Sequence, residues 1–131
     1  FEVFKKLRAH ASAHCPDMAL GIGTIYTEAD ARRFLEAGAD FIVQPVTTAG
    51  VGAVCKEAGK PWIPGAMTLN EVWAAWQLGA TVVKLFPGNL VGPDYVQALR
   101  GPMMVTCGVA PEAANIRQWL DAGVQAVGIV S

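Results

Sequence analysis

The sequence predicts an α/β fold in which parallel strands alternate with helices. Glycines recur at intervals of 20 to 22 residues, and each follows a helix-like stretch and precedes a short apolar run. A fixed period of this size indicates repeated supersecondary units. Glycine suits the left-handed position after a helix, and runs apolar on both faces are typical of parallel strands covered by helices. The repeating glycines are Gly38, Gly59, Gly79, Gly101 and Gly123.

Each strand is expected to alternate with a helix along the whole chain. The strands are expected near residues 19–24, 40–44, 61–64, 82–85, 103–106 and 124–129. The helices are expected near residues 2–14, 27–37, 48–58, 69–78, 93–99 and 111–122.

Capping residues support the helix boundaries. Thr27 and Thr68 are expected to cap helices with their hydroxyl groups, and each is followed by acidic residues in the first turn. Pro111 suits a first helical position. Trp73 and Trp76 lie three residues apart, a spacing that predicts packing of both rings against the sheet.

Six strand–helix units arranged this regularly predict a (β/α)8 TIM barrel, of which this chain covers about six units. Residues 1–131 are then a single domain, the C-terminal three quarters of a TIM barrel, and we expect the functional chain to be longer. Six strands alone would leave two apolar edges, whereas a closed barrel has none. An open doubly wound sheet is the alternative, but G-I-G-T at 21–24 lacks the third glycine of a dinucleotide-binding fingerprint.

Composition excludes several classes of protein and of site. The chain of 131 residues is 53% hydrophobic with a formal net charge of -1, which argues against disorder and against binding to nucleic acid or to anionic membranes. No apolar run is long enough to span a bilayer. Three widely spaced cysteines predict neither a disulfide framework nor a zinc ribbon, and His10 and His14 lack a third ligand. We therefore expect a cytoplasmic protein with a small-molecule partner, no metal and no cofactor.

Lys84 is the strongest candidate for chemistry. It lies near the carboxyl end of an expected strand, where barrel enzymes place their catalytic groups. Lysines are mostly exposed, but this one is enclosed by β-branched and aromatic neighbours. Desolvation disfavours the ammonium and releases the neutral amine that attacks a carbonyl. The sequence therefore predicts a Schiff-base lysine.

Several segments occur in the order found in a known enzyme family. They are L-G-I-G-T-I at 20–25, A-D-F-I-V at 39–43, P-G at 64–65, V-K-L-F-P-G at 83–88, G-P at 101–102 and T-C-G-V at 106–109. The chain thus resembles the 2-keto-3-deoxy-6-phosphogluconate and 4-hydroxy-2-oxoglutarate aldolases. The resemblance implies a class I lyase of carbohydrate metabolism, a homotrimer that cleaves a 2-keto-3-deoxy(-6-phospho) sugar acid or 4-hydroxy-2-oxoglutarate to pyruvate and an aldehyde.

The same resemblance implies a role for each candidate site residue. Lys84 matches the lysine that forms the Schiff base, and Thr24 matches a threonine of the pyruvate subsite. The substrate-binding set implied by the resemblance is Thr24, Pro64, Gly65, Phe86, Thr106, Gly108 and Ser131. Pro64, Gly65 and Phe86 would shape the pocket wall. Thr106, Gly108 and Ser131 would belong to a phosphate cup.

The chain departs from the family pattern in two respects. Cys107 and Val130 stand where the phosphate cup of the family has glycines, which predicts weaker discrimination for a phosphorylated substrate. The glutamate that shuttles protons and the arginine that meets the pyruvate carboxylate have no counterpart in this chain, and Glu2 is assigned no catalysis. A phosphate-binding TIM-barrel isomerase or synthase, and a degenerate non-catalytic barrel, remain as alternatives.

Overall fold

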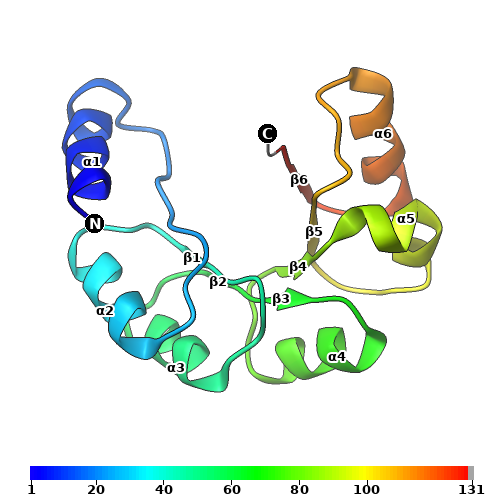
Figure 1. The fold of residues 1–131 in the computed structure, drawn as a ribbon, viewed down its shortest axis with the longest axis horizontal. Coiled ribbons are helices and arrows are strands. Elements are labelled where there is room, and N and C mark those ends of the chain that lie inside the picture. The colour runs from blue at the N-terminus through cyan, green and yellow to red at the C-terminus, as the bar shows by residue number, and fades with distance from the viewer. Residues whose placement is uncertain (130–131) are drawn as a thin grey trace.

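The computed structural model describes residues 1–129, which follow a curved arc of alternating helices and strands (Figure 1). The helices are α1 (Glu2–His14), α2 (Glu28–Glu36), α3 (Ala49–Glu57), α4 (Leu69–Gln77), α5 (Gly88–Gln97) and α6 (Ala113–Ala122). The strands are β1 (Ile42–Val43), β2 (Trp62–Ile63), β3 (Gly65–Ala66), β4 (Val83–Leu85), β5 (Met103–Thr106) and β6 (Ala126–Gly128). None of the helices in this described part is long and apolar enough to cross a membrane.

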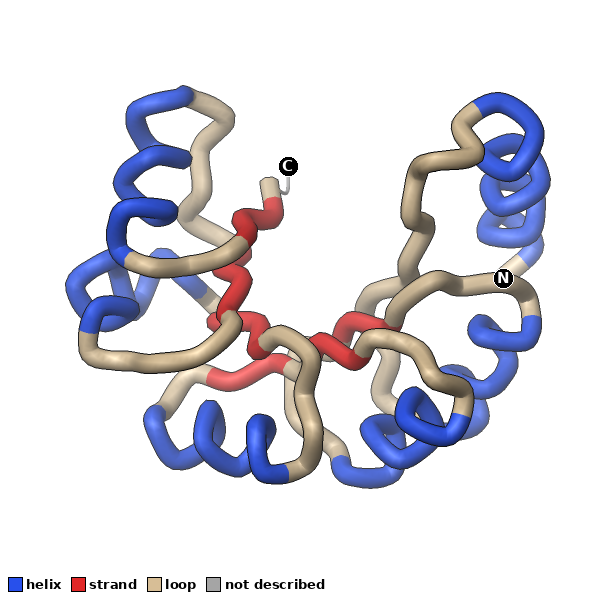
Figure 2. The backbone as a smooth tube through the Cα atoms, turned by 180° about the vertical axis from the view of Figure 1, so that it is seen from behind, coloured by secondary structure: helices blue, strands red, loops and turns tan. Residues whose placement is uncertain are grey.

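All strand pairs are parallel and follow one another around the arc. β1 pairs with β2, and a second sheet has the order β3-β4-β5-β6. Pro64 separates β2 from β3, since proline has no amide hydrogen for a ladder, but its carbonyl accepts a hydrogen bond from the Lys84 amide at 2.8 Å. The strands line the inner side of the arc and the helices cover its outer side (Figure 2).

The first expected strand is shorter than its pattern predicts. Residues 19–24 contribute an isolated parallel bridge between Ile22 and Ile42. The Ile22 amide donates to the Phe41 carbonyl at 3.1 Å, and the Ile22 carbonyl accepts from the Val43 amide at 2.8 Å. The regular pairing is interrupted at Thr24, whose φ of 60° lies outside the extended region, and the Ile25 amide then donates to the Val43 carbonyl at 3.4 Å.

The helices largely match the sequence prediction. Thr27 Oγ1 accepts from the Asp30 amide at 3.1 Å, and Thr68 forms a reciprocal capping box at α4. The five repeating glycines all have positive φ. Helix α5 begins at Gly88, before the expected start at residue 93, and Gly92 kinks it immediately before Pro93.

The prediction that Pro111 opens the last helix is wrong. Helix α6 begins at Ala113 with Glu112 as its N-cap, so Pro111 precedes the helix. The Asn115 side chain accepts a hydrogen bond from the Ala110 amide at 2.8 Å. This bond ties Ala110 to the first turn of α6 and leaves Pro111 in the bend that precedes the helix.

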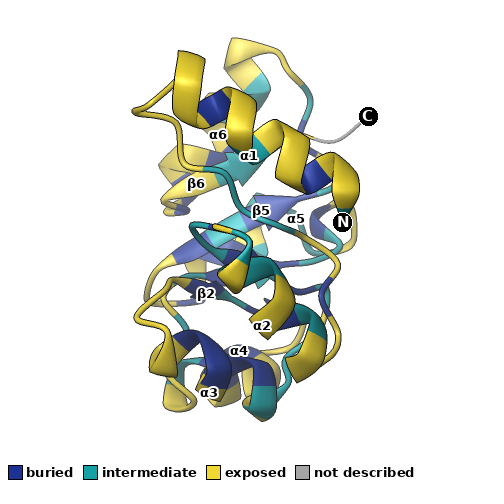
Figure 3. Cartoon of the chain, turned by 90° about the vertical axis from the view of Figure 1, so that its left-hand side faces the viewer, coloured by how far each residue is buried: buried dark blue, intermediate teal, exposed yellow. Residues whose placement is uncertain are grey.

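Two apolar clusters fill the space between the strands and the helices. One includes Ile42, Val51 and Trp62 beneath α2 and α3, and the other includes Val83 and Leu85 beneath α4, α5 and α6. Burial of one such aliphatic side chain contributes about 1.5–3 kcal/mol to stability. Buried residues gather along the strands, while α1 is mostly exposed (Figure 3).

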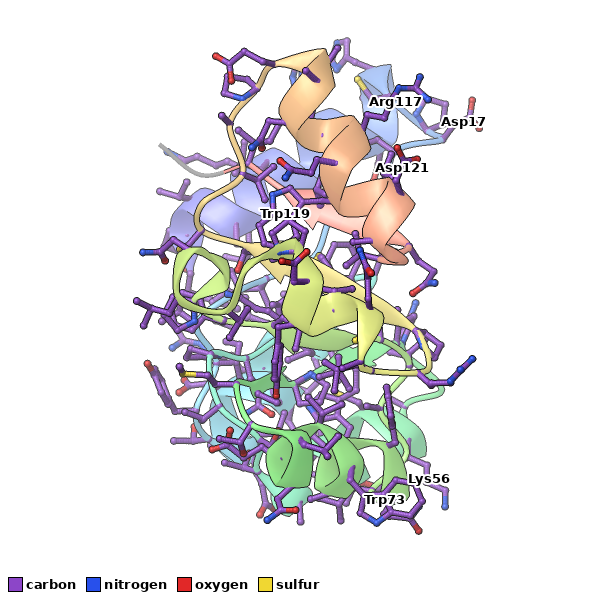
Figure 4. All side chains as sticks on the ribbon, turned by 90° about the vertical axis from the view of Figure 1, so that its right-hand side faces the viewer. Asp17, Lys56, Trp73, Arg117, Trp119 and Asp121 are labelled. Atoms are coloured by element: carbon purple, nitrogen blue, oxygen red, sulfur yellow. The ribbon has the colours of Figure 1, made fainter. Side chains whose placement is uncertain are left out.

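The expected packing of both tryptophans of α4 is only half right. Trp76 packs against the second cluster, but Trp73 is 61% exposed and stands at the outer edge of α4 (Figure 4). Positions three apart on a helix differ by about 60° in direction, which is enough here to take one ring off the core face.

Asp40 ties α1 and the first expected strand to the start of β1. Its Oδ2 accepts hydrogen bonds from Arg8 Nη1 at 2.7 Å and from the Leu20 amide at 2.8 Å. The pKa of Asp40 is lowered, mainly by the hydrogen bond from the Leu20 amide. Desolvation acts in the opposite direction, and the hydrogen bond and charge of Arg8 lower the pKa further. The carboxylate is therefore stabilised in its charged form.

We predict that Asp40→Asn lowers the free energy of unfolding at pH 7 by about 1 kcal/mol, because it removes charge-assisted hydrogen bonds at a partly exposed site. The folded-state pKa of Asp40 is lowered, so its contribution is present above the unfolded-state pKa and is lost as the pH falls through the folded-state pKa. Urea unfolding at pH 7 and near pH 2 measures this difference, which should disappear in acid.

The matched control is Glu57→Gln, which removes an exposed ion pair with Arg32 of similar length, 2.8 Å. We expect it to cost less than about 0.5 kcal/mol at either pH. Equal effects of the two substitutions would contradict the role assigned to Asp40.

Candidate active site

Strand β4 places Lys84 on the inner face of the sheet. Its neighbours Val83 and Leu85 are both 0% exposed and belong to the cluster under the helices. Because side chains alternate along a strand, Lys84 faces the opposite way, toward the inside of the arc. In register, Lys84 lies opposite Gly65 of β3 and Met104 of β5. Met104 was not among the predicted site residues, although alternation in the expected strand at 103–106 places it on this face.

The surroundings of Lys84 favour its neutral form. The side chain is half-buried, and desolvation lowers the pKa of its ammonium group, while its electrostatic interaction with nearby Cys107 acts in the raising direction. Lys84 Nζ lies 4.5 Å from the centroid of the Phe86 ring. An amine with a lowered pKa is a better nucleophile toward a carbonyl carbon near neutral pH.

The next layer toward the carboxyl ends of the strands contains Phe86, Thr106 and Gly128. Leu85 pairs with Val105, so Phe86 and Thr106 are neighbours, and Thr106 pairs with Gly128. A Cβ at Gly128 would lie 2.5 Å from Thr106 Cγ2, so only glycine allows this approach.

Thr106 carries an unsatisfied polar group in this layer. Its side chain is 6% exposed, and its Oγ1 has no hydrogen-bond partner within residues 1–129. An unpaired buried hydroxyl costs about 1–3 kcal/mol. A polar ligand group that reached this hydroxyl would recover that free energy.

Two candidate site positions have a left-handed backbone. Within residues 1–129, Thr24 (φ 60°) and Cys107 (φ 63°) are the non-glycine residues with positive φ. This conformation costs an L-residue about 1–2 kcal/mol, and such strain gathers at functional sites. Cys107 is half-buried and Gly108 follows it with φ 80°. The backbone at 107 thus has a conformation that favours glycine, the residue of the family pattern.

A cavity of about 260 Å³ opens at the carboxyl ends of β1, β3 and β4, beside Phe86. Its lining is Pro45, Val46, Thr47, Gly65, Ala66, Met67, Glu71 and Phe86. It contains two of the predicted residues, Gly65 and Phe86. Pro45 was not among the predicted site residues. Its backbone packs so closely on Gly65 that a Cβ at position 65 would clash. The position of Pro45 directly after an expected strand was the signal in the sequence that pointed to it.

The other predicted residues lie elsewhere. Pro64 is fully buried and contacts Lys84 through the backbone rather than lining the cavity. Thr24 is exposed at the end of the first strand-like segment. Ser131, with Val130, lies outside the described residues. A hollow of about 310 Å³ at the opposite end of β2, beside Lys56 and Lys60, contains none of these residues.

The histidines and remaining cysteines do not join the site. The rings of His10 and His14 stack with centroids 4.2 Å apart on exposed α1. Within residues 1–129, no group of three His, Cys, Asp or Glu residues is placed to hold a metal ion. Burial raises the pKa of the Cys55 thiol to about 11, which makes it a poor nucleophile.

Comparison with known proteins identifies the family. The family model for KDPG and KHG aldolase matches residues 5–131. The chain belongs to this aldolase family. It is 41% identical over 78 residues to a 2-dehydro-3-deoxy-phosphogluconate aldolase of Treponema pallidum, covering 60% of this chain and 37% of that protein. It is 29% identical over 133 residues to a 2-dehydro-3-deoxy-6-phosphogalactonate aldolase of Escherichia coli K12, covering 97% of this chain and 64% of that protein.

Solved structures agree with this assignment. A structure described as native KDPGal superimposes with a TM-score of 0.85 at 28% identity, over 93% of this chain and 61% of that one. The TIM-barrel prediction and the family resemblance are thereby confirmed. The chain spans less than two thirds of the length of these relatives. The fold also occurs in a glycerol uptake operon antiterminator regulatory protein of Listeria monocytogenes. That structure is 18% identical and superimposes with a TM-score of 0.72, over 95% of this chain and 72% of that one. The fold alone therefore does not define the activity.

The left-handed backbone at Cys107 generates a stability prediction. We expect Cys107→Gly to be more stable than Cys107→Ala by about 1 kcal/mol, because alanine keeps the Cβ that disfavours positive φ. Thermal unfolding of the two variants measures the order. Ala53→Gly on the exposed side of α3 is the control, since glycine there should cost about 1 kcal/mol. A Cys107→Ala variant as stable as Cys107→Gly would show that no strain is present.

Proposed function

We propose that the protein is a class I aldolase, an aldehyde-lyase, with Lys84 as its Schiff-base residue. The substrate would be a 2-keto-3-deoxy(-6-phospho) sugar acid or 4-hydroxy-2-oxoglutarate, cleaved to pyruvate and an aldehyde. The observation that carries this proposal is a half-buried lysine with a lowered pKa on the inner face of the sheet. Membership of the family and the names of the relatives support it.

The chemistry follows from the neutral amine. Lys84 Nζ attacks the C2 carbonyl of the keto acid, and loss of water from the carbinolamine gives an iminium ion. The iminium accepts the electron pair of the C3–C4 bond as that bond breaks; the C4 hydroxyl gives up its proton to a base and becomes the carbonyl of the released aldehyde, and an enamine remains. Protonation of the enamine at C3 and hydrolysis of the imine release pyruvate and restore the amine. The glutamate that the family resemblance assigns to these proton transfers has no counterpart among residues 1–131.

The binding residues would divide the substrate between two ends of the site. Thr24, together with Gly65, Phe86 and the backbone of Pro64, would hold the pyruvate moiety. Thr106, Gly108 and Ser131 would receive the distal end, where the unpartnered Thr106 hydroxyl supports a polar contact. No cofactor is required, because the iminium ion itself acts as the electron sink.

We also propose that residues 1–131 are the C-terminal three quarters of the barrel in a cytoplasmic homotrimer. The share of the relatives' length that the chain spans supports a longer protein, since a closed barrel of this type needs eight strands. Exposed apolar side chains such as Leu69 (60%) and Trp73 (61%) support self-association.

We predict that pyruvate and borohydride attach a pyruvate-derived mass to Lys84 in the full-length protein. Lys84→Ala and Lys84→Arg should abolish both the label and the activity, since a guanidinium does not deprotonate to a nucleophile. Lys60→Arg, at the other end of the barrel, is the matched control and should label like the wild type. Labelling at another lysine would refute the assignment, and no labelling would favour the isomerase, synthase or non-catalytic alternatives.

A further prediction concerns phosphate. Cys107 adds a side chain where the family has glycine. We therefore expect Cys107→Gly to raise the ratio of kcat/KM for the 6-phosphorylated substrate to that for the unphosphorylated one by about tenfold. This factor corresponds to one charge-assisted hydrogen bond at the lower end of its range. The same ratio for Cys107→Ala separates loss of the thiol from loss of the Cβ. An unchanged ratio in Cys107→Gly would show that Cys107 does not restrict the cup.

A further inference from the structure

Gln44 is a buried amide directly after β1, outside the residues assigned above. Its side chain is 0% exposed and forms three hydrogen bonds. Nε2 donates to the Ile25 carbonyl at 3.0 Å and to Thr48 Oγ1 at 2.9 Å, and Oε1 accepts from Trp62 Nε1 at 2.8 Å. A buried amide is tolerated only when it is paired in this way. One side chain therefore joins the segment at 44–48 to two segments that are distant in sequence, at Ile25 and at Trp62.

The bond to Ile25 completes a clamp around Thr24. The Ile25 amide donates to the Val43 carbonyl at 3.4 Å, so both backbone polar groups of Ile25 are bonded to the end of β1. On the other side, Ile22 is bonded through its amide and its carbonyl to residues 41 and 43. Thr24 lies between these two anchored residues.

The clamp explains how Thr24 keeps an unfavourable conformation. Its φ of 60° is rare for a β-branched residue and costs about 1–2 kcal/mol. Such strain persists only where the surrounding bonds determine the backbone. Of the bonds to Ile25, the one from Gln44 is a side-chain bond, so it can be removed by substitution while the backbone pairing is left in place.

We propose that Gln44 is a positioning residue that sets the backbone of Thr24 and thereby the place of its hydroxyl in the substrate site. This inference rests on the proposed aldolase function, in which Thr24 contacts the keto acid. Gln44 touches no reacting atom: it acts through Ile25 and Thr24. Its effect is on substrate binding, whereas the amine of Lys84 is independent of it.

The test is a kinetic cycle in the full-length protein. Gln44→Met has a similar volume and no amide, and it should raise KM for the keto acid about tenfold, as expected for one lost hydrogen bond. kcat and its pH profile, which depend on Lys84, should not change. Thr24→Ala should raise KM similarly, and the double variant should be no worse than Thr24→Ala alone, because the two residues act as a unit.

Trp62→Phe is the matched control. It removes the bond to Gln44 Oε1 and leaves the bond between Nε2 and Ile25. It should lower the melting temperature without raising KM. If Gln44→Met raised KM only through a general loss of packing, Trp62→Phe would raise KM as well.

Gln44→Glu provides a second readout if Gln44→Met does not fold. A protonated carboxyl can donate to the Ile25 carbonyl, whereas the ionised form cannot and repels that oxygen. Burial raises the pKa of a carboxyl group, so the KM of Gln44→Glu relative to wild type should be near one in acid and should rise as the pH increases. A ratio that does not vary with pH would overturn the inference.

The outcomes separate this inference from the proposed function. If borohydride traps pyruvate on Lys84 in the wild type but Gln44→Met leaves KM unchanged, or if the effects of Gln44→Met and Thr24→Ala add, Gln44 does not position Thr24. If the wild type traps no pyruvate, the proposed function fails and the inference falls with it.

Discussion

The rest of this site depends on one interaction, the desolvation of the Lys84 ammonium group on the inner face of the parallel sheet. Val83 and Leu85 are fully buried under the helices, so the strand cannot rotate Lys84 away from the inside. A register shift of one residue would bury the ammonium in the apolar cluster. The packing that stabilises the fold therefore also holds the lysine where desolvation lowers its pKa. Stability and reactivity have the same structural origin here.

The strands supply rigidity and the connections after them supply the strained positions. Thr24 and Cys107 both have left-handed backbones at the carboxyl ends of strands or strand-like segments. Thr24 is held by bonds to the end of β1, including the one from Gln44. Beside Cys107, Thr106 presents a buried hydroxyl with no partner in the described part of the chain. Strain and unsatisfied polarity thus gather at the carboxyl ends of the strands, as expected where a substrate restores lost interactions.

Local patterns were sufficient to predict most of the fold and the position of Lys84 on its strand. The glycine period gave the order of the elements, and the apolar neighbours of Lys84 indicated its place. Two details were predicted wrongly. The place of Pro111 depends on the hydrogen bond between the Asn115 side chain and the Ala110 amide, and the exposure of Trp73 depends on how α4 is rotated about its axis. Gln44 and Pro45 escaped notice because their roles arise from contacts with Ile25 and Gly65, which are distant in sequence. Periodicity carries no information about such contacts.

The acid–base behaviour of Lys84 tests the central claim most directly. With lysine side chains labelled with carbon-13, the ε-carbon resonance of Lys84, assigned by its loss in Lys84→Arg, can be titrated by NMR in the folded protein and in urea. Desolvation on the inner face predicts a midpoint in the folded protein below that of the same lysine in the unfolded chain. A folded-state midpoint equal to or above the unfolded value would contradict the claim that the sheet prepares this amine for attack.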